Sequence, residues 1–383
     1  MRQPLELYIH IPFCAEKCAY CDFLSAPAHE RVRHAYVEQL IEEIRMQSAS
    51  YEQYGVTTVF IGGGTPSVLQ EEDMAQILAQ LHDCFAIDSK AEITIEINPG
   101  TVNAGKLEVY QAGGINRISI GLQSADDREL KTLGRIHTYD EFLKTYERVR
   151  IAGFTNVSVD LMSALPGQTL ASWKSTLRKV LMLKPEHISA YSLIIEEGTP
   201  FYERYHDHPE LLPGEKEERE IYYATGKLLK EQGYERYEIS NYAKPGYECR
   251  HNIGYWTGIP YLGLGLGASS YVEGCRFQCE SDLKRYQAIR MRETLAEEKL
   301  HPEREELSQK ARMEEFMFLG LRLIKGVSGY EFMERFGQNM WNIYGEVLHR
   351  LEANHLIYVE SPYVRLTDFG IDISNYVLSE FLL

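Results

Sequence analysis

Three cysteines share one short loop near the start of the chain, in the stretch IPFCAEKCAYCDF at residues 11–23. Cys14, Cys18 and Cys21 are spaced C-x3-C-x2-C, and the next cysteine along the chain is Cys84. Thiolates select zinc, copper(I) or iron–sulfur clusters. The spacing therefore predicts a metal centre that takes three protein ligands and leaves one ligand position open.

An iron–sulfur cluster suits these three thiols better than zinc does. Structural zinc is tetrahedral and usually takes two separated ligand pairs, so it would need a fourth ligand such as His10 or His29. A four-iron cluster can use three cysteines and keep its fourth iron open. The amino and carboxylate groups of S-adenosylmethionine can chelate that iron, and reduction of the cluster can then start radical chemistry. Zinc, or three incidental buried cysteines, stays the alternative.

Six strand-then-helix units precede and follow this loop along the first part of the chain. Apolar alternation and β-branched runs predict strands at 5–11, 56–61, 92–97, 116–122, 156–162 and 187–193. Helical patterns are found at 30–49, 70–85, 103–112, 126–151, 169–183 and 215–232. Such alternation predicts a parallel sheet with right-handed crossovers. Six units are too few for an eight-stranded barrel, so a partial barrel or an open doubly wound sheet is expected.

Glycines and polar residues recur where the predicted strands end. Residues 62–65, which read GGGT, follow the second strand, and Glu96 and Asn98 end the third. Gln123 follows the fourth strand, and Asp160 lies near the end of the fifth. Ligands of parallel α/β folds gather at the C-terminal ends of the strands. We therefore expect one binding site there, although each residue alone could serve a turn or a solvated strand end.

The composition indicates a globular protein without a basic surface. The chain has 383 residues, 44% of them hydrophobic, and a formal net charge of −16, which argues against non-specific nucleic-acid binding. No segment approaches the roughly 18 apolar residues of a membrane span, and the N-terminal residues show no signal region. A cytoplasmic location is therefore expected. Seven cysteines, an odd number, make a disulfide framework unexpected.

The chain is expected to divide into three parts, a partial barrel at 1–240, a connecting segment at 241–300 and a C-terminal domain at 301–383. The last part is mostly helical up to about residue 353, and LIYVESPYVRLTDFG then predicts two short strands before a final helix. Helices followed by a hairpin are typical of a winged-helix module. Acidic residues outnumber basic ones there, which argues against DNA binding.

A second specific stretch is CRHNIGYW at residues 249–256. Imidazole is a usual axial ligand of heme iron, so His251 could supply one. Tyr255 and Trp256 offer flat apolar faces for a porphyrin and polar tips for its edge. Physical chemistry alone favours a structural alternative, in which His251 hydrogen-bonds within a loop and the two aromatic residues pack a domain junction.

Together these motifs resemble those of the radical S-adenosylmethionine enzymes of the oxygen-independent coproporphyrinogen III oxidase family. Within that family, CRHNIGYW matches the H-N-x-x-Y-W motif of the HemW-type heme chaperone branch. The resemblance covers nearly the whole chain. It implies an α/β fold, a partial (β/α)6 radical SAM barrel with a mostly helical, winged-helix-like C-terminal domain.

The resemblance also implies three cofactors, which are a [4Fe–4S] cluster, S-adenosylmethionine and heme. The implied metal ligands are Cys14, Cys18 and Cys21. The implied S-adenosylmethionine contacts are Tyr8, Gly63, Gly64, Thr65, Glu96, Gln123, Arg135 and Asp160. The implied heme motif consists of His251, Asn252, Tyr255 and Trp256. Glycines let backbone approach a ligand closely, carboxylates suit ribose hydroxyls or an ammonium, and an arginine can pair with a carboxylate.

The sequence departs from the oxidase branch in two places. Those enzymes resemble this chain in the cluster loop but carry a further cysteine where this chain has Phe23, and they have a longer segment before the first strand. Both features are tied to substrate turnover. We therefore expect a heme chaperone that transfers heme to acceptor proteins and assign no catalytic residue. The main alternative is oxidative decarboxylation of coproporphyrinogen III, and another radical enzyme, such as a methylase, is a third.

The partners implied by this reading are heme, heme-acceptor proteins with respiratory enzymes as candidates, and an electron donor for the cluster. Nucleic acid is not expected. Peripheral association with a membrane is compatible with such a role.

Overall fold

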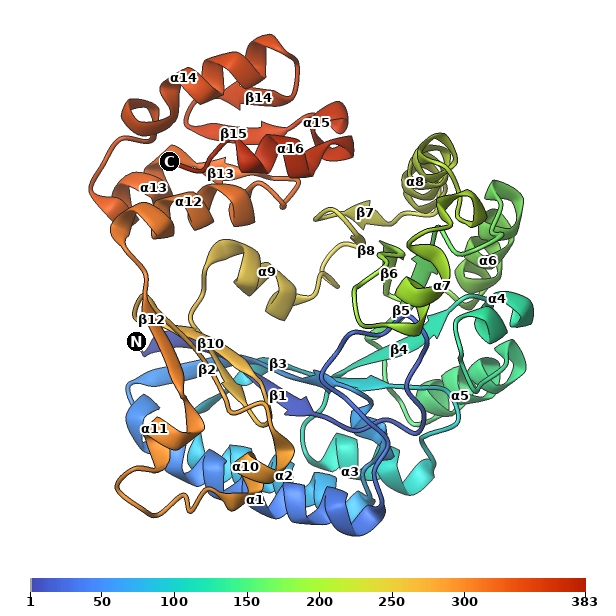
Figure 1. Ribbon diagram of the computed structural model, residues 1–383, viewed down its shortest axis with the longest axis vertical. Coiled ribbons are helices and arrows are strands. Elements are labelled where there is room, and N and C mark those ends of the chain that lie inside the picture. The colour runs from blue at the N-terminus through green and yellow to red at the C-terminus, as the bar shows by residue number, and fades with distance from the viewer. Residues whose placement is uncertain (1) are drawn as a thin grey trace.

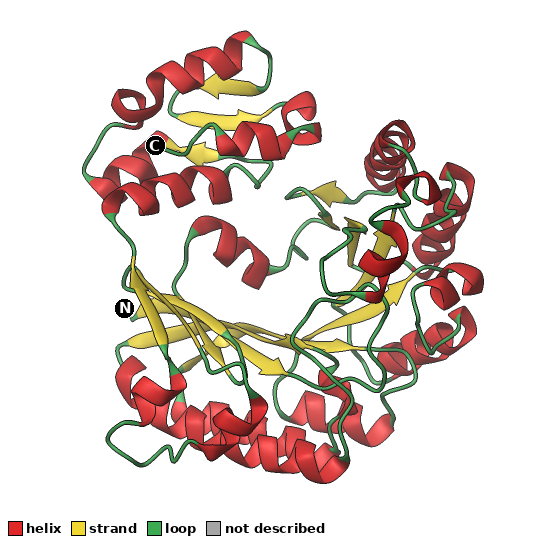
Figure 2. Cartoon of the chain, in the orientation of Figure 1, coloured by secondary structure: helices red, strands yellow, loops and turns green. Residues whose placement is uncertain are grey.

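A curved twelve-stranded sheet forms the larger part of the protein, and its centre is parallel (Figure 1, Figure 2). The computed structural model describes residues 2–383. The six central strands pair in chain order, each parallel to the next. They are β1 (Gln3–Ile11), β2 (Tyr54–Gly63), β3 (Ile87–Ile97), β4 (Arg117–Gln123), β5 (Val157–Ser163) and β6 (His187–Ser192). This order confirms the predicted partial (β/α)6 barrel and excludes the doubly wound alternative.

Helices cover the convex side of the sheet (Figure 1). They are α1 (Glu30–Ser48), α2 (Glu71–Cys84), α3 (Ala104–Ala112), α4 (Asp127–Thr132), α5 (Tyr139–Ile151), α6 (Leu170–Leu183) and α8 (Glu215–Glu231). The short helix α7 (Pro200–Tyr205) instead lies against the loop of the three cysteines, where Phe201 N donates to Ala19 O at 2.9 Å. Leu7 and Ile9 of β1 and Leu40 and Ile44 of α1 are all 0% exposed and belong to one hydrophobic core. Parallel sheets need such cover because their crossovers place helices on the faces.

Residues 235–306 extend both ends of this sheet. Beyond β6 lie β8 (Asn241–Ala243) and β7 (Glu235–Arg236), and beside β1 lie β9 (Tyr261–Leu264), β10 (Ser269–Val272), β11 (Cys275–Gln278) and β12 (Glu303–Glu306). The same stretch contains α9 (Arg250–Thr257), α10 (Leu283–Ala288) and α11 (Ala296–Leu300). The predicted domain boundaries stay predictions, but residues 241–300 do more than connect, because they supply strands of the main sheet.

Residues 307–383, here called the C-terminal module, have a hydrophobic core of their own. Its helices are α12 (Gln309–Gly320), α13 (Gly329–Phe336), α14 (Met340–Ala353), α15 (Asp368–Asp372) and α16 (Ser374–Ser379). A small antiparallel sheet has the order β13 (Val327–Ser328), β15 (Tyr363–Leu366), β14 (Ile357–Glu360). The predicted hairpin and final helix are confirmed.

Helix α9 lies on the concave side of the sheet, between the barrel and the C-terminal module (Figure 1). Its first backbone N–H groups are held by Glu92 of β3, whose carboxylate accepts from Arg250 N at 3.2 Å and from His251 N at 3.3 Å. The first N–H groups of a helix lack partners within the helix, so this carboxylate satisfies them. The contact fixes where α9 sits on the sheet.

Glycine at position 254 allows α9 to approach β1 closely. A Cβ added there would lie 1.9 Å from Oε1 of Glu6, and Glu6 is completely buried. The carboxyl group of Glu6 therefore has no open space into which it could move.

In the part of the chain that the structure describes, no helix is long and apolar enough to cross a membrane.

The first prediction concerns this close approach. Gly254→Ala should displace α9 and lower the free energy of unfolding by about 1–3 kcal/mol, because overpacking a filled interior strains it. Gly345→Ala is the matched control, since Gly345 also lies inside a helix but has no atom within 4 Å of an added Cβ. That substitution should stabilise by up to about 1 kcal/mol. Urea unfolding measures both, and equal effects would contradict the tight seating of α9.

Candidate functional site

The three predicted cluster ligands lie in the loop that follows β1. Cys14 is buried, Cys18 and Cys21 are partly exposed, and all three are free thiols. Burial raises the pKa of Cys14 and of Cys21, and the charge of Cys18 raises both further, so the thiols lie within electrostatic reach of one another. Backbone bonds hold the loop against the end of β2, including Thr65 N to Phe13 O at 2.7 Å.

The donor set fits an iron–sulfur cluster, although the thiols do not converge on one point in this conformation. Among residues 2–383, no group of three or more His, Cys, Asp or Glu side chains is arranged to hold a metal ion. Of the two histidines considered as a fourth zinc ligand, His10 is not available, because both of its ring nitrogens are engaged. His10 Nε2 lies 2.9 Å from Leu24 O, and His10 Nδ1 lies 3.0 Å from the Tyr8 hydroxyl. The fit to an iron–sulfur cluster therefore rests on the three free thiols of this loop. His10 offers no nitrogen that could complete a zinc site.

Arg135 joins the cysteine loop to the ends of β3 and β4. Its guanidinium donates to Cys18 Sγ at 3.5 Å, to Asn98 Oδ1 at 2.7 Å and to Gly121 O at 2.6 Å. Asn98 in turn donates to Thr65 Oγ1 at 2.8 Å. Cys18, Thr65, Asn98 and Arg135 are thus linked in one polar cluster at the ends of the strands.

Gly63 and Glu96 form a second part of the predicted S-adenosylmethionine edge. Gly63 has φ 110°, and an added Cβ would lie 2.6 Å from the His10 ring, so only glycine fits. Its N–H donates to Glu96 Oε2 at 3.2 Å. Burial, together with the charge of Asp160, raises the pKa of Glu96 to about 8. Glu96 is therefore mostly protonated near neutral pH and can both donate and accept hydrogen bonds.

The remaining predicted contacts are placed less directly. Gly64 lets the chain pass close to the cysteine loop, since an added Cβ would lie 2.5 Å from Phe13 O. Gln123 ends β4 with φ 71°. Asp160 accepts from the Ser119 hydroxyl at 2.9 Å, within the sheet. Neither Gln123 nor Asp160 lines the cavity described next.

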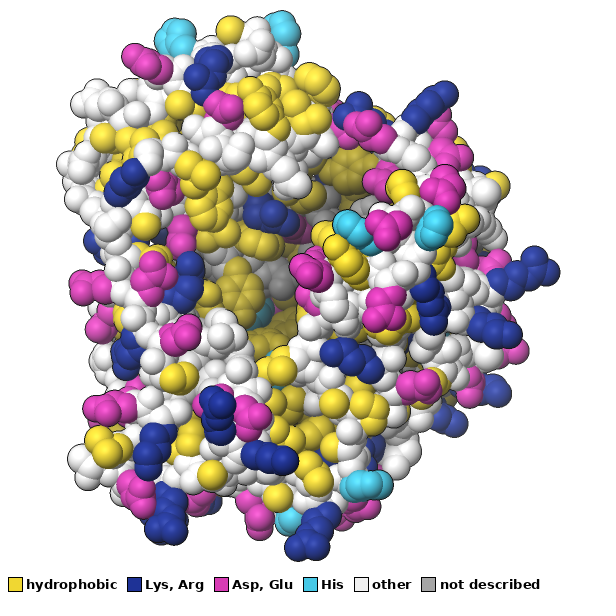
Figure 3. Space-filling model, in the orientation of Figure 1, with side chains coloured by type: hydrophobic (Ala, Val, Ile, Leu, Met, Phe, Trp, Pro, Cys, Tyr) yellow, Lys and Arg dark blue, Asp and Glu magenta, His cyan; other side chains and the backbone are white. Residues whose placement is uncertain are grey.

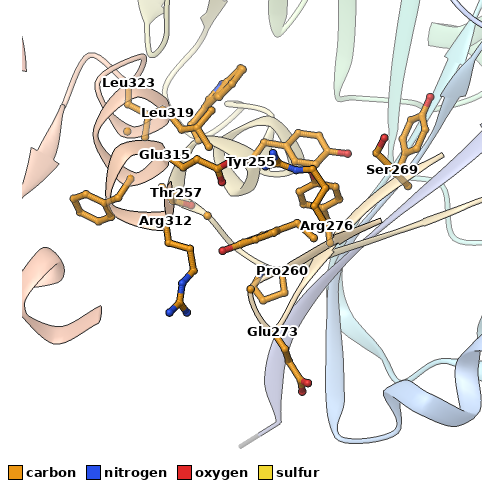
Figure 4. Close-up of a pocket in the computed structure, with 18 of the residues that line it drawn as sticks. Tyr255, Thr257, Pro260, Ser269, Glu273, Arg276, Arg312, Glu315, Leu319 and Leu323 are labelled. Carbon is orange, nitrogen blue, oxygen red and sulfur yellow. Dashed lines mark hydrogen bonds and ion pairs between the residues drawn. The ribbon is translucent and has the colours of Figure 1, made fainter. Parts of the chain in front are cut away.

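A cavity of about 990 Å³ separates the concave side of the barrel from the C-terminal module. Figure 3 shows it as a hollow with hydrophobic side chains along it. Tyr8, Gly63 and Glu96 line it on the barrel side, and Tyr255 and Trp256 line it from α9. Figure 4 shows Tyr255 among the residues of the wall. Its volume lies at the upper end of the range for small-molecule and cofactor sites. The predicted S-adenosylmethionine contacts Gly63 and Glu96 therefore line the same cavity as the aromatic residues Tyr255 and Trp256.

His251 does not face this cavity. Its side chain is buried, with Nδ1 2.7 Å from Thr58 Oγ1 and Nε2 3.1 Å from the Tyr255 hydroxyl. Its ring stacks on Phe60 with centroids 5.2 Å apart. Burial, together with the charge of Arg117, lowers the pKa of His251 to about 3, so the ring is neutral. Neither nitrogen is free to bind iron unless one of these hydrogen bonds breaks.

The other members of the motif separate in the same way. Asn252 is absent from the cavity wall, whereas Trp256 forms part of it. The guanidinium of Arg322 lies 4.5 Å from the centre of the Trp256 ring system. The pattern H-N-x-x-Y-W thus divides into a buried histidine that anchors α9, a half-buried asparagine outside the cavity wall, and two aromatic residues that line the cavity.

Sequence reasoning missed the wall that the C-terminal module contributes. Arg312, Phe316 and Leu319 of α12 and Arg335 of α13 line the cavity, together with Arg276 of β11. A local signal does exist, because Arg312 and Phe316 are four residues apart and share one face of a helix. Nothing in the sequence indicates that this face meets α9.

Comparison with known proteins places the chain in a class and then in a family. The Radical SAM superfamily matches residues 8–180, and the HemN C-terminal domain matches residues 307–373. Coproporphyrinogen III oxidase (HemN) from Escherichia coli has a TM-score of 0.86 at 22% identity, covering 100% of this chain and 90% of that one, so the two share a fold. The class is therefore that of radical S-adenosylmethionine proteins, whose cofactors are a [4Fe–4S] cluster and S-adenosylmethionine.

Two relatives match over nearly their full length. The heme chaperone HemW of Lactococcus lactis is 37% identical over 383 residues, covering 100% of this chain and 98% of that protein. The heme chaperone HemW of Bacillus subtilis is 36% identical over 378 residues, covering 98% of each. The chain belongs to the HemW heme chaperone family.

The second prediction concerns the cluster, which when bound supplies an electron to S-adenosylmethionine. Anaerobic reconstitution should load about four irons per chain. Cys18→Ala should abolish loading, because three thiolates are the minimum donor set here. Cys84→Ala is the control, since Cys84 is a free cysteine outside this loop. Iron analysis and absorbance measure the outcome, and stoichiometric zinc without iron would contradict the assignment.

Proposed function

We propose that this protein is a heme chaperone that binds heme in the cavity between the barrel and the C-terminal module. It holds a [4Fe–4S] cluster through Cys14, Cys18 and Cys21 and binds S-adenosylmethionine at the adjoining strand ends. It transfers heme to acceptor proteins, with respiratory enzymes as candidates. The observation that carries this proposal is the single cavity of about 990 Å³, which joins Gly63 and Glu96 to Tyr255 and Trp256.

The chemistry of the cavity wall supports a large flat ligand. Aromatic side chains provide much apolar contact area, and their polar tips can bond the edge of a ligand. Tyr255 and Tyr261 meet edge to face with ring centroids 4.7 Å apart, which holds both rings against the wall. Phe316 adds a third ring from the opposite side. A porphyrin needs such a slot and one ligand for its iron.

His251 acts in this proposal as a positioning residue, and Tyr255 as the residue that meets the heme. The hydrogen bond between His251 Nε2 and the Tyr255 hydroxyl, 3.1 Å long, supports this division. A tyrosine oxygen can bind heme iron, as imidazole can. The neutral His251 ring can accept a hydrogen bond from the Tyr255 hydroxyl and so fix the direction in which the Tyr255 oxygen points.

The third prediction separates these two roles. His251→Gln should keep most of the heme affinity, because a glutamine amide can still bond the Tyr255 hydroxyl but is a poor iron ligand. His251→Ala and Tyr255→Phe should each weaken heme binding about tenfold and shift the Soret band. Titration with hemin followed by absorbance measures all three. Loss of binding in His251→Gln, together with an unchanged spectrum in Tyr255→Phe, would make His251 the direct ligand.

The coproporphyrinogen oxidase alternative rests on the shared fold alone. At 22% identity the likeness to HemN concerns architecture. Phe23 occupies the position at which the oxidases carry a further cysteine. Its side chain is 62% exposed and lines the edge of the cavity. A phenyl ring can neither donate nor accept a proton there.

The fourth prediction follows from this difference. Reconstituted protein with reductant and excess S-adenosylmethionine should leave coproporphyrinogen III unconverted, because a radical reaction needs its substrate positioned to within about 1 Å. Carbon dioxide release and product chromatography measure the outcome. Heme binding by the same preparation is the control for intact protein. Multiple turnovers would favour the oxidase instead of the chaperone.

A further inference from the structure

Three arginines line the part of the cavity between strands β10 and β11 and the C-terminal module. Arg276 belongs to β11, Arg312 to α12 and Arg335 to α13. In Figure 4, Arg312 extends from α12 into the space beside the strands that carry Glu273 and Arg276. These residues lie outside the motifs that define the cluster and S-adenosylmethionine edge, so the proposed function leaves them without a role.

Two of the three arginines have no acidic partner. Arg276 pairs with Glu315, with Nη2 2.8 Å from Oε1. Within residues 2–383, neither Arg312 nor Arg335 forms an ion pair with a carboxylate. Both guanidinium groups therefore line the cavity without a carboxylate to neutralise them. Of the other acidic residues in the wall, Glu273 is bonded by the Tyr54 hydroxyl at 3.1 Å.

Neighbouring residues hold both unpaired guanidinium groups at the wall. Arg312 reaches across to the turn after β10, where an added Cβ on Gly274 would lie 3.4 Å from its Nη1. Arg335 lies over the Phe316 ring, 5.3 Å from its centre, and its Nη1 would lie 2.9 Å from a Cβ on Gly258. The two glycines therefore leave room for these side chains.

Tyr271 lines the same part of the cavity as the three arginines. Burial and the charge of Glu315 raise the pKa of the Tyr271 hydroxyl, whereas the charges of Arg312, Arg276 and Arg335 all oppose that rise. The Arg276 guanidinium lies 5.9 Å from the centre of the Tyr271 ring. Tyr271 thus lies within electrostatic reach of all three arginines and of Glu315, at the wall of the cavity.

We infer that Arg312 and Arg335, with the Tyr271 hydroxyl between them, bind the two propionate carboxylates of the tetrapyrrole whose ring lies against Tyr255 and Phe316. This inference rests on the proposed heme chaperone function and assigns it a specificity element. Arginine suits the task because its planar fork bonds a carboxylate with two parallel hydrogen bonds. The C-terminal module would then select tetrapyrroles that carry carboxylates.

The test compares heme with heme dimethyl ester, in which both carboxylates are blocked. Wild-type protein should bind heme at least about tenfold more tightly than the ester, because charge-assisted hydrogen bonds are lost in the ester. Arg312→Gln and Arg335→Gln should each weaken heme binding about tenfold and leave ester binding unchanged. Arg365→Gln is the matched control, since Arg365 belongs to the same module, pairs with Glu360 and does not line the cavity.

Arg312 and Arg335 are here called the arginine clamp. The possible outcomes test this clamp separately from the heme chaperone function on which it rests. If wild-type protein binds neither compound, the heme chaperone proposal fails and the clamp fails with it. If wild-type protein binds heme and both variants match it, the clamp is overturned and the function stands. Equal loss of heme and ester binding in the variants would show a structural role for the arginines and would also overturn the clamp. Circular dichroism and the melting temperature of each variant establish that it is folded.

Discussion

The seating of α9 on the concave side of the barrel is the constraint on which the rest of the site depends. Glu92 holds the first N–H groups of α9, and His251 is bonded at both ring nitrogens. Buried polar groups are costly unless they are paired, so these bonds leave α9 one stable position. With its buried side fixed in this way, α9 presents Tyr255 and Trp256 to the cavity.

One carboxyl group beside α9, that of Glu6, is buried in the barrel interior without an ion-pair partner that is charged. Burial raises the pKa of Glu6 to about 9, so this residue is neutral near pH 7, 3.8 Å from His251 Nδ1. His251 is neutral as well, because its pKa is lowered to about 3. A charged pair here would lose solvation that the interior cannot replace. Two neutral groups can pack closely, and Gly254 leaves the room that they need.

The sequence predicts the elements whose signals are local. Strands β1 to β6 are apolar or β-branched runs, and the helices between them repeat with the helical period, so both were predicted within a few residues. The expectation of a binding site at the C-terminal ends of the strands came from the same reasoning, because parallel strands all end at one side of the sheet. Strands β7 to β12 were missed because each is only two to four residues long, too short for an alternating pattern to show. In addition, β8 and β9 join the main sheet through β6 and β1, which lie far away in the chain. The glycines of 263–267 also weaken any strand pattern.

The orientation of His251 could not be predicted for the same reason. Its partner Thr58 lies 193 positions earlier in the chain, and the motif alone cannot show which side of α9 is buried. A histidine in a heme motif suggests an iron ligand, whereas the fold uses this one to hold a tyrosine. The opposing wall, with Arg312 and Arg335, depends likewise on how α12 and α13 meet α9.

A ligand in this cavity touches two separate hydrophobic cores. The barrel core supplies the wall at Tyr8 and Gly63, and the C-terminal module, which has its own core, supplies Phe316 and Val327. Contacts from both cores add to the affinity for a ligand only while the ligand touches both cores at once. A small separation of the two cores therefore removes one wall at once.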